Sequence, residues 1–262
     1  MLQFAIQRGN TDVLNELLDA GADVDSTFGV LQTSPLQWAV WCKQLDIVRL
    51  LFHREASQDH INILGWDITF FCWDQLDYQQ GSVLDILNLL AEDAYQNLSV
   101  ADTKGWTALY RAAAAGRPEE VVRLIELGAD PYQAALPLRW NAIHHAVFHG
   151  NFSTFEALLP YYGDSAIIMA DERGWTLLHI AASAGHDQII RNLLRLGANP
   201  QARSRPFATH MPQEICNRKV TPQEAAAAQG LEREMQYMIA VQEHLEKLLD
   251  DAPFFDAKEV AI

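Results

Sequence analysis

Residues 174–186 read Gly174-Trp175-Thr176-Leu177-Leu178-His179-Ile180-Ala181-Ala182-Ser183-Ala184-Gly185-His186, and Leu193-Leu194-Arg195-Leu196-Gly197-Ala198-Asn199 follows shortly after them. A threonine side chain accepts a hydrogen bond from the first turn of a helix, and glycine ends a helix because it adopts left-handed backbone at little steric cost. The apolar residues between these positions recur with helical spacing. The stretch therefore predicts two short helices joined by a turn.

The same pattern returns along most of the chain. The positions equivalent to Thr176 are Ser34, Asp67, Thr107, Asn141, Thr176 and Thr221. The gaps between them are 33, 40, 34, 35 and 45 residues. A further unit at the start of the chain begins part-way through the pattern, and we interpret it as a shortened first repeat, with a longer array as the alternative. This period and the motif around Thr176 resemble the ankyrin repeat, whose repeats have about 33 residues and a T-P-L-H-x-A signature.

The resemblance implies an all-α ankyrin-repeat solenoid of about seven helix–turn–helix repeats joined by β-hairpin-like loops. The predicted repeats are 1–33, 34–66, 67–106, 107–140, 141–175, 176–220 and 221–250, within one ankyrin-repeat domain at 1–250, followed by a C-terminal tail at 251–262. The match is looser in the third and fifth repeats, where the segments after Asp67 and Asn141 depart from the signature. In such an array each repeat buries its apolar face against its neighbours.

Composition restricts the compartment and the kind of partner. The chain has 262 residues, of which 49% are hydrophobic, and a net charge of −15. Its three cysteines have no metal-site spacing, which indicates a reducing intracellular compartment, cytoplasmic or nuclear. No apolar run is long enough to span a membrane, and the acidic charge disfavours nucleic acid as a partner. We therefore expect a soluble, monomeric protein without membrane insertion.

Tryptophan occupies the position just before the threonine equivalent in four consecutive repeats. In the family this position lies near the tip of the hairpin loop, on the side that binds partners. We expect Trp66, Trp106, Trp140 and Trp175 to form an aromatic ladder, with successive rings about 10 Å apart. Variable positions of the inner helices, as the resemblance implies, are Trp38, Trp41, Phe71, Arg111, His145, Phe148 and His149. Lys104, Arg139 and Arg173 lie beside the ladder in sequence and make the hairpin side locally basic.

Aromatic and arginine side chains are enriched at interaction hot spots, so the sequence predicts a scaffold or adaptor that binds a protein partner through the concave and hairpin surfaces. The partner segment is expected to be acidic or aromatic and apolar. A second hypothesis is a small-molecule binder or atypical enzyme with an aromatic pocket. That pocket would use Trp38, Trp41, Phe71, Trp73, Trp106, Arg111 and His145. A third interpretation is that the tryptophans only stiffen the stack and that the charges are ordinary solvated ones.

The histidines separate into two groups. His144 and His179 occupy the signature position, and the resemblance implies a structural role for them within and between hairpins. His145 and His149 share one helical face and have side chains able to bind metal or move a proton, but the sequence assigns no third ligand. We therefore predict no catalytic residue, no metal and no cofactor. Two insertions, near 74–80 and 200–220, are predicted to be recognition elements. The first lengthens the link between the two helices of its repeat, and the second is either a flap over the inner surface or a disordered extension of its hairpin.

Overall fold

The computed structural model describes residues 1–72, 81–92, 98–206, 219–231, 236 and 239–240. These residues belong to two compact units, 1–163 and 164–262. Within the described residues every regular element is a helix, and the hairpin loops contribute three isolated β-bridges, Phe28 to Thr33, Ala135 to Trp140 and Ala170 to Thr176. The predicted all-α fold class, with β-hairpin-like loops between helices, is confirmed.

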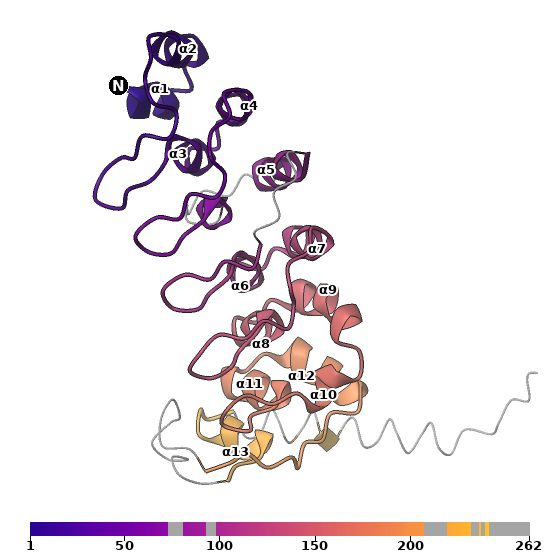
Figure 1. Ribbon diagram of the computed structural model, residues 1–262. Helices are drawn as coiled ribbons and strands as arrows, with labels where there is room; N and C mark the ends of the chain where they lie inside the picture. Colours follow the sequence, from indigo (N-terminus) through magenta and orange to yellow (C-terminus); the bar gives the residue numbers. More distant parts are fainter. Residues whose placement is uncertain (73–80, 93–97, 207–218, 232–235, 237–238, 241–262) are drawn as a thin grey trace, which may run out of the picture. The chain divides into compact units, whose positions relative to one another are not determined.

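The first unit consists of two rows of helices (Figure 1). The inner row, from which the hairpin loops project, is α1 (Leu2–Gln7), α3 (Pro35–Trp41), η1 (Ile68–Cys72), α6 (Ala108–Ala114) and α8 (Ala142–Phe148). The outer row is α2 (Thr11–Asp19), α4 (Leu45–His53), α5 (Gly81–Glu92), α7 (Pro118–Glu126) and α9 (Phe152–Tyr162). Each helix packs on its partner in the pair and on the next helix of its own row, as repeat stacking requires.

The inner helices begin at hydrogen-bonding side chains. Ser34 Oγ accepts the backbone N–H of Gln37 at 3.2 Å, and Gln37 Oε1 accepts the N–H of Ser34 at 3.1 Å, which together form a capping box. Thr107 Oγ1 accepts from the N–H of Tyr110 in the same way. Alanines such as Ala112 are completely buried and let the inner helices approach closely.

The inner helix of the third repeat is not an α-helix. Residues Ile68–Cys72 form a 3-10 helix, and Asp67 Oδ1 accepts the N–H groups of Thr69 and Phe70 at 3.0 and 3.2 Å. The sequence predicts that Asp67 is the equivalent of Thr176. In the structure its carboxylate accepts the hydrogen bonds at the start of this helix. The insertion that follows, near 74–80, and Trp73 lie outside the described residues.

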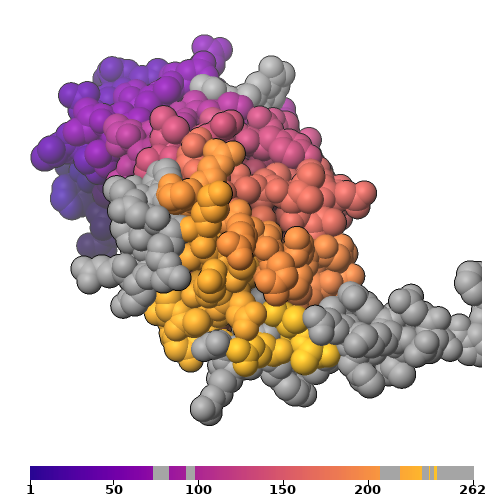
Figure 2. All heavy atoms as spheres, turned by 90° about the horizontal axis from the view of Figure 1, so that it is seen from below, coloured from indigo at the N-terminus to yellow at the C-terminus, as the bar shows by residue number. Residues whose placement is uncertain are grey.

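The second unit contains α10 (Ser165–Ile168), α11 (Leu177–Ala184), α12 (Asp187–Arg195) and α13 (Pro222–Ala227). Helix α11 packs against both α12 and α13. Thr221 and Glu224 form a capping box, with Pro222 in the first turn of α13, as their order in the sequence predicts. Part of the segment 219–231 is visible at the surface of this unit in Figure 2, whereas Val220, Ala225 and Ala226 within it are buried. The tail at 251–262 and most of the 200–220 insertion fall outside the described residues.

Candidate functional site

Three of the tryptophan-bearing loops are built on a buried acid or amide side chain. Asp102 Oδ1 accepts the backbone N–H groups of Lys104 and Trp106 at 2.8 and 2.9 Å, and the N–H of Asp102 donates to the carbonyl of Trp106 at 2.9 Å. Gly105 between them has a φ of +79°. The same closed loop occurs at 62–66 and 171–175, with Asn62 and Asp171 as acceptors. The acceptor in these three loops was not identified from the sequence. Its constant position, four residues before a tryptophan that follows a glycine, is a pattern from which it could have been predicted.

Neighbouring loops of the first unit are connected to one another. The N–H of Ile63 donates to the carbonyl of Leu31 at 3.3 Å, and the N–H of Thr103 donates to the carbonyl of Leu64 at 3.1 Å. A Cβ atom placed on Gly65 would lie 3.2 Å from the Cα of Asp102. The hairpin loops at 28–33, 62–66 and 102–106 therefore form a row with backbone in contact with backbone.

The loop before Trp140 has a different construction, and it makes one wall of a cavity. The N–H of Ala135 donates to the carbonyl of Trp140 at 2.7 Å, and Leu136, Pro137 and Leu138 lie between them. The cavity has a volume of about 280 Å³. Its lining is Trp106, Ala135, Leu136, Pro137, Leu138, Trp140, His145, Phe148 and His149. The lining contains no carboxylate and is mostly apolar.

His145 on α8 is the centre of the aromatic cluster at this cavity. Its ring centroid lies 5.2 Å from that of Trp106, 5.2 Å from that of Tyr110 and 5.5 Å from that of Trp140. The side chain is only 5% exposed, and burial, with smaller contributions from two neighbouring histidines, lowers its pKa to about 4. The imidazole is therefore neutral at physiological pH, and it lines the cavity as an uncharged aromatic ring. Phe148, whose ring lies 5.1 Å from that of Trp140, is 46% exposed.

A second aromatic cluster lies on α3, η1 and the 62–66 loop. Trp38 and Trp41 are parallel with centroids 6.3 Å apart, and Trp41 meets Phe71 edge-on at 5.8 Å. Phe71 in turn contacts Trp66 at 5.7 Å. Phe71 is buried, whereas the three tryptophans are half-buried. The three indoles of this cluster are therefore partly accessible to solvent, whereas the phenyl ring of Phe71 is buried.

The predicted residues of the second unit, Trp175 and Arg173, lie inside the structure. They are only 3% and 5% exposed. Arg173 donates from Nε to Asp171 Oδ2 at 2.8 Å, and its guanidinium carbon lies 4.2 Å above the centre of the Trp175 ring. The N–H of Arg205 donates to the carbonyl of Arg173 at 2.7 Å, so the start of the 200–220 insertion covers this loop. The expectation that these two side chains are available to a partner does not fit their burial.

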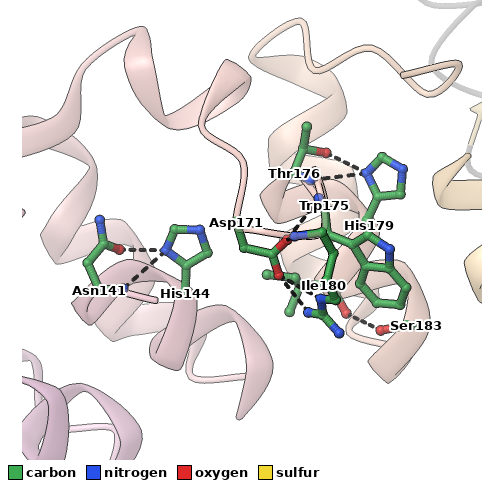
Figure 3. A network of polar contacts seen from close by, with 9 residues as sticks. Asn141, His144, Asp171, Trp175, Thr176, His179, Ile180 and Ser183 are labelled. Carbon is green, nitrogen blue, oxygen red and sulfur yellow. Dashed lines mark hydrogen bonds and ion pairs between the residues drawn. The ribbon is translucent and has the colours of Figure 1, made fainter. Parts of the chain in front are cut away.

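The signature histidines cap helices, as the resemblance implies (Figure 3). The N–H of Thr176 donates to His179 Nδ1 at 3.1 Å, and His179 Nε2 lies 3.0 Å from the carbonyl oxygen of Val220. In the first unit His144 Nδ1 lies 2.6 Å from Asn141 Oδ1. Among the described residues no group of three or more His, Cys, Asp or Glu side chains converges in a way that would hold a metal ion.

The structure thus brings some of the predicted site residues together and separates others. Trp106, Trp140, His145, Phe148 and His149 line one cavity. The residues proposed for a single small-molecule pocket do not share it, because Trp38, Trp41, Phe71 and Arg111 are absent from its lining. The Leu136–Pro137–Leu138 segment lines the cavity, and the buried Tyr110 stacks on His145 behind it. Both were missed, because neither stands at a variable position of the repeat pattern. The four-tryptophan ladder remains a prediction, since Trp175 belongs to the second unit.

Comparison with known proteins identifies the family. A model of ankyrin repeats in three copies matches residues 1–62 and 132–204, and a model of the single ankyrin repeat matches residues 104–135. The chain belongs to the ankyrin-repeat family. No described helix has the length and apolarity needed to cross a membrane.

Several known proteins are similar to parts of this chain. Protein phosphatase 1 regulatory subunit 27 of Mus musculus is 39% identical over 87 residues, which is 33% of this chain and 55% of that protein. The B-cell lymphoma 3 protein homolog of Mus musculus is 29% identical over 170 residues, or 64% of this chain and 37% of that protein. The crystal structure of the ankyrin repeat domain of Bcl-3 superposes with a TM-score of 0.67 at 24% identity, covering 88% of this chain and 97% of that one. The match therefore spans about half of the phosphatase regulatory subunit.

Proposed function

We propose that the chain is a protein-interaction module, a scaffold or adaptor, and that the cavity at Trp106 and Trp140 receives a large apolar or aromatic side chain of its partner. The observation that carries this proposal is the cavity itself, with its aromatic walls and the exposed Phe148 at its edge. Aromatic side chains in well-packed pockets are where binding free energy concentrates in protein interfaces.

The size and the lining of the cavity are compatible with one large apolar side chain. Pockets for drug-sized ligands have volumes of roughly 300–1,000 Å³. The cavity of about 280 Å³ lies at the lower end of this range and can hold one large side chain. The lining also lacks a carboxylate, and its buried His145 is neutral, so the walls offer little to a charged small molecule.

The relatives support a regulatory role. One of them is named as a regulatory subunit of protein phosphatase 1, a protein that acts through another protein. By analogy, the chain would bring its partner to a second component and would itself carry out no catalysis. The free thiols of Cys42 and Cys72 support a reducing location, in the cytoplasm or the nucleus.

The test compares partner capture by the full chain and by a Trp106→Ala, Trp140→Ala double variant, with retained proteins from the source cells identified by mass spectrometry. We expect the variant to lose at least tenfold of a specific partner, because two hot-spot aromatics are removed. Phe4→Ala is the matched control, since Phe4 is also an exposed aromatic but does not line the cavity. Equal retention by all three proteins would remove the cavity from the account.

A further inference from the structure

Arg111 on α6 is a cation that lies over two neighbouring aromatic rings, which stack on each other with centroids 6.2 Å apart. Its guanidinium carbon lies 4.6 Å from the centre of the Trp66 ring and 4.9 Å from the centre of the Phe70 ring. The side chain is only 17% exposed. Stacking on two rings fixes the guanidinium plane and removes much of its water.

One donor of this guanidinium, the buried Nε, has no acceptor among the described residues, and no carboxylate of those residues lies within hydrogen-bonding distance of the others. Its one ion-pair partner in the described part of the chain is Asp102, whose Oδ2 lies 3.7 Å from Nη2, too far for a hydrogen bond. The buried Nε of Arg111 has no acceptor there either. Buried polar groups in native proteins are nearly always hydrogen-bonded, so the unpaired Nε points to an acceptor that the described residues do not supply.

Asp171 and Arg173 in the second unit form a comparable aspartate–arginine pair, in which the guanidinium is hydrogen-bonded to the carboxylate. Arg173 lies in the loop of Asp171, stacks on Trp175, and binds Oδ2 through both Nε at 2.8 Å and Nη2 at 2.7 Å. In the first unit, Asp102 stands at the same loop position as Asp171, yet Arg111 stays out of hydrogen-bonding reach of its carboxylate. Arg173 is thus hydrogen-bonded to its aspartate, whereas Arg111 forms no hydrogen bond with Asp102 and keeps donors for a second carboxylate.

We propose that Arg111 binds the carboxylate of an aspartate or glutamate side chain in the same protein partner whose apolar side chain enters the cavity. This inference rests on the proposed function and specifies the chemistry of the partner. A planar guanidinium matches a carboxylate with two parallel hydrogen bonds. A doubly charged phosphate is disfavoured because the buried carboxylate of Asp102 is adjacent.

The loop at 102–106 connects the two binding sites. Asp102 faces Arg111 through Oδ2, and through Oδ1 it holds the N–H of Trp106, whose ring lines the cavity. One short loop therefore separates the carboxylate site from the apolar site. An acidic residue and an apolar residue separated by only a few positions in one partner segment satisfy both.

The test uses synthetic peptides of twelve residues, acetylated and amidated so that the side chain is the only carboxylate. Each has a tryptophan or leucine and, one to four positions away, a glutamate in a glycine-serine background. Every peptide has a counterpart with glutamine and one with phosphoserine at the glutamate position. Binding to the full-length chain is measured by fluorescence polarisation, and the Arg111 Nε–H signal is followed by NMR.

We expect the best glutamate peptide to bind about tenfold more tightly than its glutamine counterpart and to shift the Arg111 Nε–H signal. In Arg111→Gln the two peptides should bind equally, and Arg111→Lys should recover only part of the preference because it lacks the planar fork. Arg123→Gln is the control, since Arg123 on α7 donates to Glu126 within its own helix at 3.2 Å. It should retain the full preference.

Each other outcome is decisive. Equal binding of glutamate and glutamine peptides to the unsubstituted chain would overturn the carboxylate site while leaving the apolar cavity and the proposed function intact. Tighter binding of phosphoserine peptides would replace the carboxylate by a phosphate. If the preference persists in Arg111→Gln, another residue carries it. If no peptide binds at millimolar concentration, both the site and the proposed function fail.

Discussion

At the scale of single residues, the neutral imidazole of His145 makes stability depend on pH. The unfolded chain protonates histidine near pH 6.5, whereas folded His145 has a pKa of about 4. Between these values the unfolded state binds more protons, so the free energy of unfolding falls as the pH is lowered from 6.5 towards 4. The contribution of His145 to this loss is about 2 kcal/mol between pH 7 and pH 5.

Urea unfolding of the wild type and of His145→Phe, at pH 7, 6 and 5, measures this contribution. The phenyl ring keeps the aromatic contacts but does not titrate, so the variant should lose about 2 kcal/mol less than the wild type over this range. His179, whose pKa burial also lowers to about 4, leaves a residual dependence in both proteins. Identical pH dependence in the two proteins would show that His145 is accessible to protons when folded.

Gly65 offers a second residue-scale prediction, on the contact between neighbouring loops. Gly65 and Gly29 both have positive φ, +77° and +64°, so alanine is strained at either position. Only at Gly65 would the new Cβ lie 3.2 Å from the backbone of Asp102, whereas nothing lies within 4 Å at Gly29. We expect Gly29→Ala to lower the free energy of unfolding by about 1 kcal/mol and Gly65→Ala by about 2 kcal/mol. Chemical denaturation measures the free energy of unfolding of both variants. Equal decreases in Gly29→Ala and Gly65→Ala would mean that the neighbouring loops separate freely.

The roles of some residues followed from the sequence, and those of others did not. His144 and His179 were assigned as structural because the repeat signature places them at the start of a helix, and both cap there. Trp175 has the same sequence context as Trp106, yet it is buried. The loop of Trp175 is contacted by residues 204–205, about thirty positions further along the chain, and the Trp175 ring lies against Arg173 and His179. A local motif contains no information on such a contact.

At the scale of elements, the side-chain acceptor at the base of the loops at 62–66, 102–106 and 171–175 controls the conformation of these three loops. Asn62 accepts the N–H groups of Leu64 and Trp66 just as Asp102 accepts those of Lys104 and Trp106. The amide oxygen is therefore an adequate replacement for the carboxylate in this geometry. Asp102→Asn should lower the free energy of unfolding by about 1 kcal/mol, chiefly through the lost charge opposite Arg111, and Asp102→Ala by about 3 kcal/mol.

Thermal and urea unfolding of the two Asp102 variants provide the measurement, and the Trp106 indole N–H signal in NMR reports the loop. We expect this signal to keep its position in Asp102→Asn and to move in Asp102→Ala. If both variants are destabilised equally, the charge on Asp102 matters more than its hydrogen bonds. That result would also weaken the comparison between the loops at 62–66 and 102–106.

The helices themselves were predictable, because capping residues and apolar spacing act locally. The capping boxes at Ser34 and Thr221 and the paired helices that follow agree with the pattern. The third repeat was recognised as irregular from Asp67 onward, but the 3-10 geometry of Ile68–Cys72 depends on how Asp67 binds two N–H groups. The cavity was not predicted as a unit, because its Leu136–Pro137–Leu138 wall comes from a loop whose path no repeat pattern specifies.

At the scale of the whole molecule, an ankyrin array distributes its stability over interfaces between neighbouring repeats. The predicted number of seven repeats and their boundaries remain a prediction, but the stacking of inner helix on inner helix within each unit agrees with the principle. Each interface is local, so damage to one repeat should spread to adjacent repeats and then fade.

Leu14→Ala tests this locality by hydrogen exchange. Leu14 on α2 is completely buried, and α2 packs on α1 and α4, so the cavity left by the substitution should weaken these helices by about 2–3 kcal/mol. We expect faster amide exchange in α1 to α4 and unchanged exchange in α11 to α13 of the second unit. Val13→Ala, on the same helix but 39% exposed, should leave all helices unchanged. A uniform acceleration across the described helices would instead show that the whole chain opens in one cooperative step, and the nearest-neighbour account would have to be abandoned.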